Sequence, residues 1–212
     1  MDMPPRSSRG FQLTIWVTCL IVVSAAVVAW SQRYLSSGSL GLRTVFPLFG
    51  LLAFSLMWTH YVSGALQRYL DYPGQVLDKY FTVTSSVVLV LILLHPGLFI
   101  VQLWLDGLGL PPASYLSVYT ELASRIALVL GTLSLVAFLV FELRRKFKAA
   151  SWWKYVELIN ILAMFAIFYH ALRLGGVFSI EWYTNLWFGY GILLIISVSY
   201  NYLYDRKKRR TA

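Results

Sequence analysis

Six long apolar runs, separated by short polar breaks, dominate the pattern of hydrophobic and polar positions. They cover residues 11–31, 45–65, 80–103, 121–142, 153–174 and 181–204. Each run has the roughly 20 apolar residues that an α-helix needs to cross a bilayer. The breaks between them contain turn-forming residues, as in "SSGSLG", "DYPGQ" and "DGLGLPPAS". The pattern predicts an all-α, polytopic membrane protein built as a bundle of six transmembrane helices.

Composition agrees with a membrane protein, because 58% of the residues are hydrophobic, only 13% are charged, and the mean hydropathy is +0.67. A soluble domain carries about 25% charged residues. We expect a short cytoplasmic tail at 1–10, a membrane domain at 11–204 and a basic cytoplasmic tail at 205–212. The single cysteine, Cys19, lies inside the first run, so neither a disulfide framework nor a thiolate metal site is expected.

The net charge of +9 does not indicate nucleic-acid binding here, because the basic residues lie at the ends of the apolar runs. With a cytoplasmic N-terminus, 14 of the 18 Lys and Arg residues fall on the inner side. The four on the outer side are Arg33, Arg43, Arg125 and Arg173. The positive-inside rule therefore predicts both termini in the cytoplasm of a multi-pass inner- or plasma-membrane protein.

Two histidines are expected at the same depth in the membrane. His95 follows Lys79, and His170 follows Lys154, in each case by sixteen residues along a run that starts at the inner face. At a rise of about 1.5 Å per residue, both lie about 24 Å above that face. Two imidazoles at one level on two helices are typical of a haem held edge-on, with both axial positions of the iron filled by histidine.

An alternative is that His95 and His170 are structural, each hydrogen-bonded to a backbone carbonyl or to water. His60 has no other histidine at its level, which is near the inner end of the second helix. It is either an interfacial residue in an aromatic belt with Trp58 and Tyr61, or a contact for a quinone or flavin, or a ligand in another arrangement.

The outer arginines break the charge rule and need a reason. Arg173 is three residues after His170, hence on nearly the same helix face, and Arg125 opens the fourth helix. We expect both to face the two carboxylates that a haem would carry, although snorkelling to lipid phosphates is the alternative. Glu157, near the inner face, either pairs with Lys154 or caps the helix start, and is a secondary candidate for binding a cofactor.

The predicted bundle has six helices, one histidine on each of the third and fifth, and the basic inner segment "ELRRKFKAASWWKYVE". In these features the chain resembles the ferric reductase-like transmembrane domain over about residues 43–174. That family includes the membrane cores of NADPH oxidases, metalloreductases, and the similarly small haem-binding membrane subunit of the periplasmic methionine sulfoxide reductase system. Two-haem members carry a second histidine 13 or 14 residues before each outer one. Here those positions hold Thr82 or Phe81, and Glu157 or Val156. The resemblance therefore implies one haem b.

The resemblance implies a b-type cytochrome that passes electrons to an external acceptor, either ferric iron or a periplasmic reductase partner. No glycine-rich nucleotide fingerprint follows a strand, so electrons would come from a separate flavoprotein or from quinol. A bound flavin or quinone is expected at the inner side, near His60, Trp152 and Trp153, and the basic segment 144–148 is a candidate docking surface. The alternatives are a haem-free scaffold or transporter subunit, and a quinol-oxidising cytochrome.

Overall fold

The computed structural model describes residues 8–35, 40–142, 147 and 150–211, and these residues form an all-α bundle without a strand. Six helices are long and apolar enough to cross a membrane. They are α1 (Ser8–Tyr34), α2 (Leu42–Tyr69), α3 (Asp78–Leu105), α5 (Leu122–Phe141), α7 (Trp153–Leu174) and α8 (Glu181–Thr211). The shorter elements are η2 (Gly74–Leu77), α4 (Ala113–Val118) and η3 (Gly176–Ser179). The predicted six-helix membrane bundle is confirmed.

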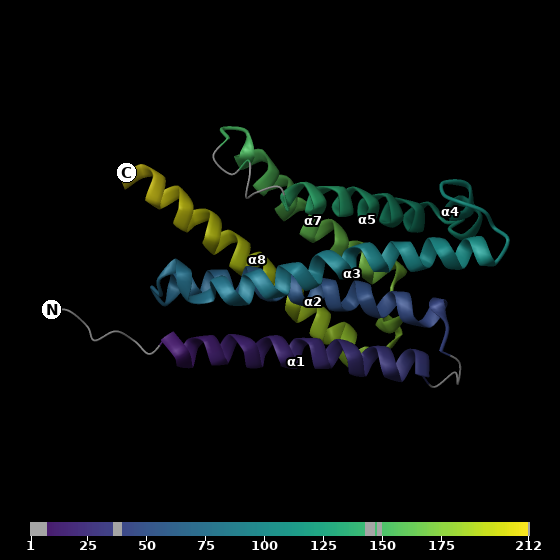
Figure 1. Ribbon diagram of the computed structural model, residues 1–212, viewed down its shortest axis with the longest axis horizontal. Helices are drawn as coiled ribbons and strands as arrows, with labels where there is room; N and C mark the ends of the chain where they lie inside the picture. The colour runs from purple at the N-terminus through teal and green to yellow at the C-terminus, as the bar shows by residue number, and fades with distance from the viewer. Residues whose placement is uncertain (1–7, 36–39, 143–146, 148–149, 212) are drawn as a thin grey trace.

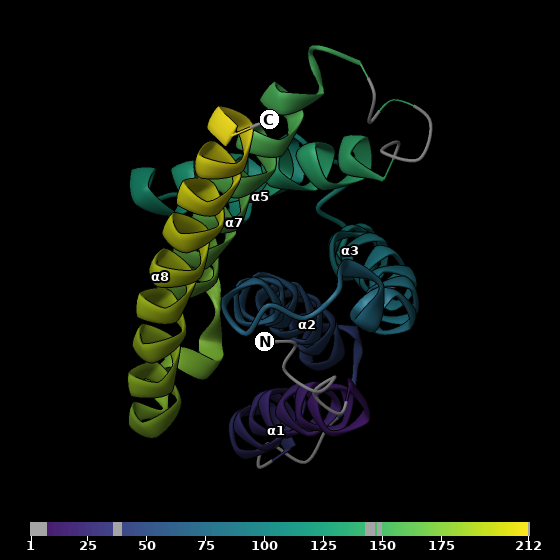
Figure 2. The same ribbon diagram turned by 90° about the vertical axis from the view of Figure 1, so that its left-hand side faces the viewer.

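The helices form two groups around a central α2 (Figures 1 and 2). The helix α2 packs against α1, α3 and α8, whereas α5 packs mainly against α7. The short α4 lies at one end of the bundle, the α4 end. The start of α1 and the end of α8 lie at the opposite end, the terminal end, as an even number of spans requires.

All six long helices contribute to the core, and many of its large side chains come from α2 and α8. Trp187, Tyr183 and Leu194 are fully buried on α8, and the ring of Phe54 on α2 lies 4.1 Å from the ring of Trp187. The outward faces are also apolar, with residues such as Leu20 and Ile192 more than half exposed. Exposed apolar faces on α1, α3, α5, α7 and α8 are unfavourable in water and favourable in lipid, which supports a membrane location.

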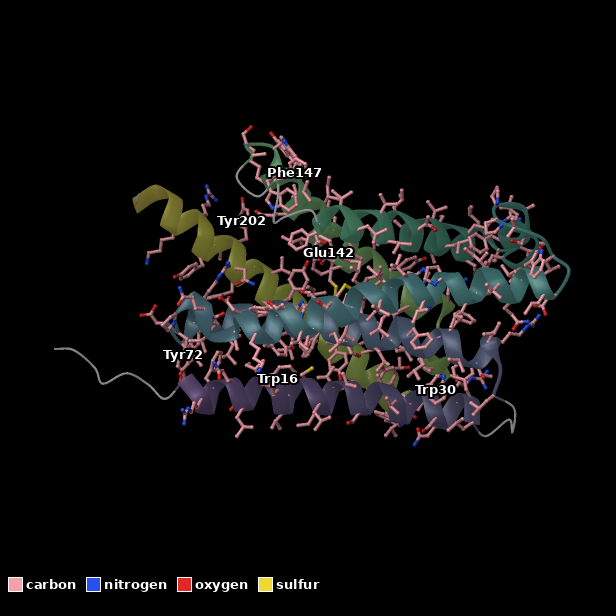
Figure 3. The ribbon with its side chains drawn as sticks, in the orientation of Figure 1. Trp16, Trp30, Tyr72, Glu142, Phe147 and Tyr202 are labelled. Atoms are coloured by element: carbon pink, nitrogen blue, oxygen red, sulfur yellow. The ribbon has the colours of Figure 1, made fainter. Side chains whose placement is uncertain are left out.

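Aromatic side chains are found toward both ends of the bundle (Figure 3). Trp30 lies toward the α4 end of α1, and Tyr72 and Tyr202 lie at the terminal end. Trp and Tyr are enriched where a bilayer meets water, because their rings are apolar and their N–H or O–H groups are polar. The Trp30 indole N–H donates to the carbonyl of Thr44, 2.6 Å away, and so joins α1 to the start of α2.

The helix bounds add two details to the predicted spans. Pro96 does not end its helix, because α3 continues through it to Leu105. The helix α8 continues from the predicted span into the basic tail as far as Thr211. Most of the basic segment 144–148, proposed as a docking surface, lies outside the described residues.

Candidate functional site

The two histidines predicted to share a depth lie side by side. His95 on α3 and His170 on α7 have ring centroids 6.4 Å apart, and their planes are nearly perpendicular at 84°. The helices that hold them are not consecutive spans, and α5 separates them in the chain. The prediction that the two imidazoles meet at one level is confirmed.

Each imidazole is oriented by a backbone carbonyl of the preceding long helix. Nδ1 of His95 lies 2.8 Å from the carbonyl oxygen of Phe46, and Nδ1 of His170 lies 2.8 Å from that of Ala127. A carbonyl can only accept, so Nδ1 carries the proton in both rings. In the neutral imidazole the lone pair is then on Nε2, the nitrogen left to bind a metal.

A glycine makes room for each ring. A β-carbon added to Gly50 on α2 would lie 2.8 Å from Cε1 of His95, and one added to Gly131 on α5 would lie 2.6 Å from Cε1 of His170. Real β-carbons are not found this close to other heavy atoms, so any side chain at either position would displace the imidazole. Both glycines therefore let a ring pack directly on the backbone of its neighbouring helix.

The same arrangement occurs twice in the bundle. In the α2–α3 pair and again in the α5–α7 pair, the first helix supplies a glycine and the second supplies the histidine. The carbonyl that accepts the Nδ1 proton, from Phe46 or Ala127, comes four residues before the glycine in both cases. The two copies share only these few positions, too few to form a recognisable repeat in the sequence.

A cavity of about 490 Å³ lies against both histidines. Its wall comes from all six long helices, from η3 and from the loop around α4, and it is mostly apolar, with residues such as Ile92, Leu135 and Ile167. Cofactor pockets in proteins typically measure about 300–1,000 Å³ and are lined in this way. Among the described residues, none forms a hydrogen bond with Nε2 of either ring.

The residues present fit a haem with two axial histidines. Two imidazoles bound on opposite sides of one metal ion, at about 2.0 Å through Nε2, would have centroids roughly 6.3 Å apart. The 6.4 Å separation agrees with this spacing. The fixed Nδ1–H, the glycine cradles and the apolar cavity supply the orientation and the dry surroundings that such a group needs. Within the described residues, no three His, Cys, Asp or Glu side chains cluster as they would around a metal ion held by protein alone.

The alternative interpretation is that His95 and His170 only stabilise the fold. It also predicts the hydrogen bond from each Nδ1 to a backbone carbonyl. Metal-binding histidines make the same bond, so it does not separate the two interpretations. The cavity does favour a bound group, since two histidines that only stabilise the fold do not need one.

The outer arginines have different surroundings. Arg43 lines the cavity, together with Tyr34, Tyr115 and Tyr119. Arg125 donates from Nε to the carbonyl of Tyr119, at 2.7 Å, and the guanidinium of Arg173 pairs with Glu121. Both arginines thus hold the loop between α3 and α5, and their predicted contact with haem carboxylates stays a prediction.

The tyrosine at the end of α4 is a neutral hydrogen-bond donor. Burial raises the pKa of Tyr119 above its ordinary value, and the neighbouring phenols of Tyr115 and Tyr34 raise it further. The hydroxyl of Tyr119 therefore keeps its proton at neutral pH. Its ring also lies near Phe99, with centroids 6.1 Å apart, on the same side of the cavity.

His60 lies apart from this cavity, in the half of the bundle near the terminal end. Thr84 donates its hydroxyl proton to the carbonyl of Tyr80, so Nε2 of His60 must donate to Thr84 Oγ1, 2.5 Å away. The His60 ring also packs edge-on against Tyr80 and Phe81. These contacts attach α2 to α3 and agree with a structural role.

The positions that hold the inner ligand pair in two-haem proteins carry no imidazole. Phe81 packs on His60, and Thr82 is exposed on α3. Glu157 is half-buried on α7, and no ion pair with Lys154 is seen among the described residues. Trp152 and Trp153 pack against each other at the start of α7, with centroids 5.7 Å apart.

Sequence reasoning missed three features of the site: the carbonyl partners, the role of Gly50, and the place of Arg43 on the cavity wall. Nothing in the sequence indicated that Gly131 lies against the imidazole of His170. The chain matches no protein-family model, no curated protein and no solved structure. Its function is therefore argued from the geometry of the site.

Proposed function

We propose that this protein is a b-type cytochrome, a membrane subunit that carries electrons through one haem held by His95 and His170. The observation that carries the proposal is the pair of imidazoles, 6.4 Å apart, with both Nδ1 atoms bound to carbonyls beside a cavity of about 490 Å³. The resemblance to the ferric reductase-like domain supports the same function.

The chain's own residues would hold the haem and exclude water from it. His95 and His170 would hold the haem iron through their Nε2 atoms, and the carbonyls of Phe46 and Ala127 would raise the electron density on those nitrogens by accepting hydrogen bonds from Nδ1–H. When bound, haem would supply one-electron chemistry at its iron. The apolar wall would exclude water and lower the local dielectric constant, which adjusts the reduction potential.

The electron acceptor is proposed to lie beyond the α4 end, because His170 is only one turn from the end of α7 at Leu174. Ferric iron and a periplasmic reductase partner both fit this position. The electron donor would be a separate flavoprotein or quinol at the terminal end, where a bound flavin or quinone near His60, Trp152 or Trp153 would shorten the path.

Spectra of the purified protein test the proposal. Expressed with added haem, it should show a Soret band and a reduced-minus-oxidised difference spectrum of a low-spin b-type cytochrome. His95→Ala and His170→Ala should each abolish the low-spin spectrum, whereas His60→Ala should leave it nearly unchanged. Full haem retention in both the His95 and the His170 variants would leave the haem-free scaffold or transporter subunit as the better interpretation.

Liposome assays then separate the electron donors. If a quinol analogue reduces the haem in protein-only liposomes, the quinol-oxidising cytochrome is favoured. If reduction requires an added flavoprotein, the subunit depends on that partner. The His60→Ala variant is informative in the first case, because a quinol site beside His60 would lose activity while the spectrum stays intact.

A further inference from the structure

One cation lies on the wall of the cavity. Arg43 is one helical turn before Phe46 on α2, and about 10 Å toward the α4 end from Gly50. It also lines a smaller adjoining cavity of about 180 Å³, which shares Phe46 and Phe99 with the first. The lining of the main cavity contains no carboxylate among the described residues. Its electrostatics therefore favour an anionic ligand.

The other outer arginines are bound elsewhere. Arg33 donates to the carbonyl of Gly176, at 3.2 Å, and Arg125 donates to the carbonyl of Tyr119. Arg173 pairs with Glu121, the residue immediately before the first turn of α5. These interactions fasten loops to helices. Arg43 differs because its position lets it reach both the solvent and the cavity.

The partner of Arg43 is exchangeable. Its guanidinium pairs with Asp106, at the end of α3; the side chain of Arg43 is 67% exposed and that of Asp106 is 23% exposed. The amide of Gln102 also donates to Asp106, at 2.8 Å, so this carboxylate keeps a hydrogen bond when Arg43 turns away. Solvent screens the exposed guanidinium, and ion pairs screened in this way contribute little to stability. A carboxylate of a bound ligand can thus replace Asp106 beside Arg43 at a small cost, and Gln102 remains as a partner for Asp106.

We propose that Arg43 binds a free carboxylate of the macrocycle in the cavity, and that Asp106 competes with that carboxylate for the guanidinium. The macrocycle would then lie with its acidic edge toward the α4 end. This inference rests on the proposed function. It assigns to Arg43 the role that sequence analysis expected of Arg125 and Arg173.

The test compares haem with its dimethyl ester, which has the same macrocycle but no carboxylate charge. Each is titrated into the full-length apoprotein in detergent, and binding is followed by the Soret band. The variants are Arg43→Gln, Asp106→Asn and, as a matched control, Arg173→Gln, which also neutralises an outer arginine paired with a carboxylate.

For the diacid, Arg43→Gln should weaken binding about 10-fold to 100-fold, the range expected for one charge-assisted hydrogen bond. For the ester, the same variant should bind like the wild type. Asp106→Asn should bind the diacid up to about fivefold more tightly, because an exposed competing ion pair is removed. This gain keeps the test informative even if Arg43→Gln does not fold.

The outcomes test the proposed cytochrome function and the role of Arg43 separately. If the wild-type protein binds neither form, the proposed function fails. If it binds both forms, and Arg43→Gln and Asp106→Asn leave the diacid-to-ester ratio unchanged, Arg43 is not the anchor although the cytochrome assignment stands. If Arg173→Gln alone changes that ratio, Arg173 is the anchor and the inference is overturned.

Discussion

Gly131 on α5 lies directly against the imidazole of His170 on α7, so close that a β-carbon there would be 2.6 Å from Cε1 of the ring. The ring can occupy this place only while residue 131 has no side chain. Because the carbonyl of Ala127, one turn earlier on the same helix, accepts the Nδ1 proton, α5 fixes both the position and the tautomer of His170. Gly50 and Phe46 on α2 do the same for His95.

The first prediction concerns these glycines. Gly131→Ala and Gly50→Ala should each push an imidazole out of line, with a loss of haem affinity of about tenfold or more, because overpacking costs about 1–3 kcal/mol. Haem that remains should become partly high-spin as one axial bond is lost. Haem content and electron paramagnetic resonance of the purified variants measure both effects.

Gly64→Ala is the matched control, since it lies on α2 like Gly50 but a β-carbon there would meet nothing within 4 Å. It should keep the wild-type spectrum. A Gly131→Ala protein with normal haem content and a purely low-spin signal would show that the ring does not need this cradle.

The sequence determined the helices and the depth of the histidines, because both follow from local quantities. Runs of apolar residues specify the spans, and a fixed rise per residue places His95 and His170 at one level. How each helix is rotated about its axis depends on packing between helices distant in the chain. The sequence therefore did not reveal that His95 meets Gly50, or that Arg43 instead of Arg173 lines the cavity.

The partners of the outer arginines show the same limit. Arg173 was expected to face a ligand because it follows His170 by three residues, yet it pairs with Glu121, a residue of the loop that precedes α5. Loop carboxylates such as Glu121 and Asp106 carry no periodic signal. Only the three-dimensional arrangement brings them to the ends of other helices.

The second prediction concerns His60. Thr84→Val removes the hydroxyl that accepts the His60 Nε2 proton and keeps the shape of the side chain. Hydrogen bonds between membrane helices contribute on average about 0.6 kcal/mol, so the free energy of unfolding should fall by about that amount. Unfolding in denaturing detergent measures the loss. The haem spectrum should not change, and a clear spectral shift would indicate that the region around His60 contacts the cofactor.

The third prediction is a stoichiometry of one haem per chain. The described residues contain one pair of facing histidines, and the positions of a second pair hold Phe81 or Thr82 and Val156 or Glu157. None of these side chains can replace an imidazole in a low-spin haem. Haem extracted as its pyridine complex, divided by protein from amino-acid analysis, should give a ratio near one. A ratio near two would reveal a ligand pair that includes His60.

The fourth prediction is the orientation of the bundle. The excess of basic residues, 14 against 4, predicts that the terminal end is cytoplasmic and that the α4 end is outside. The only cysteine, Cys19, is buried, and replacing it with Ala provides a background without thiols. Single cysteines at Gln75, exposed in η2 after α2, and at Leu110, exposed before α4, then report the two ends. In intact cells, a membrane-impermeant maleimide should label Leu110→Cys and spare Gln75→Cys until the membrane is opened. The reverse pattern would invert the bundle, and the haem proposed near the α4 end would then face a cytoplasmic acceptor.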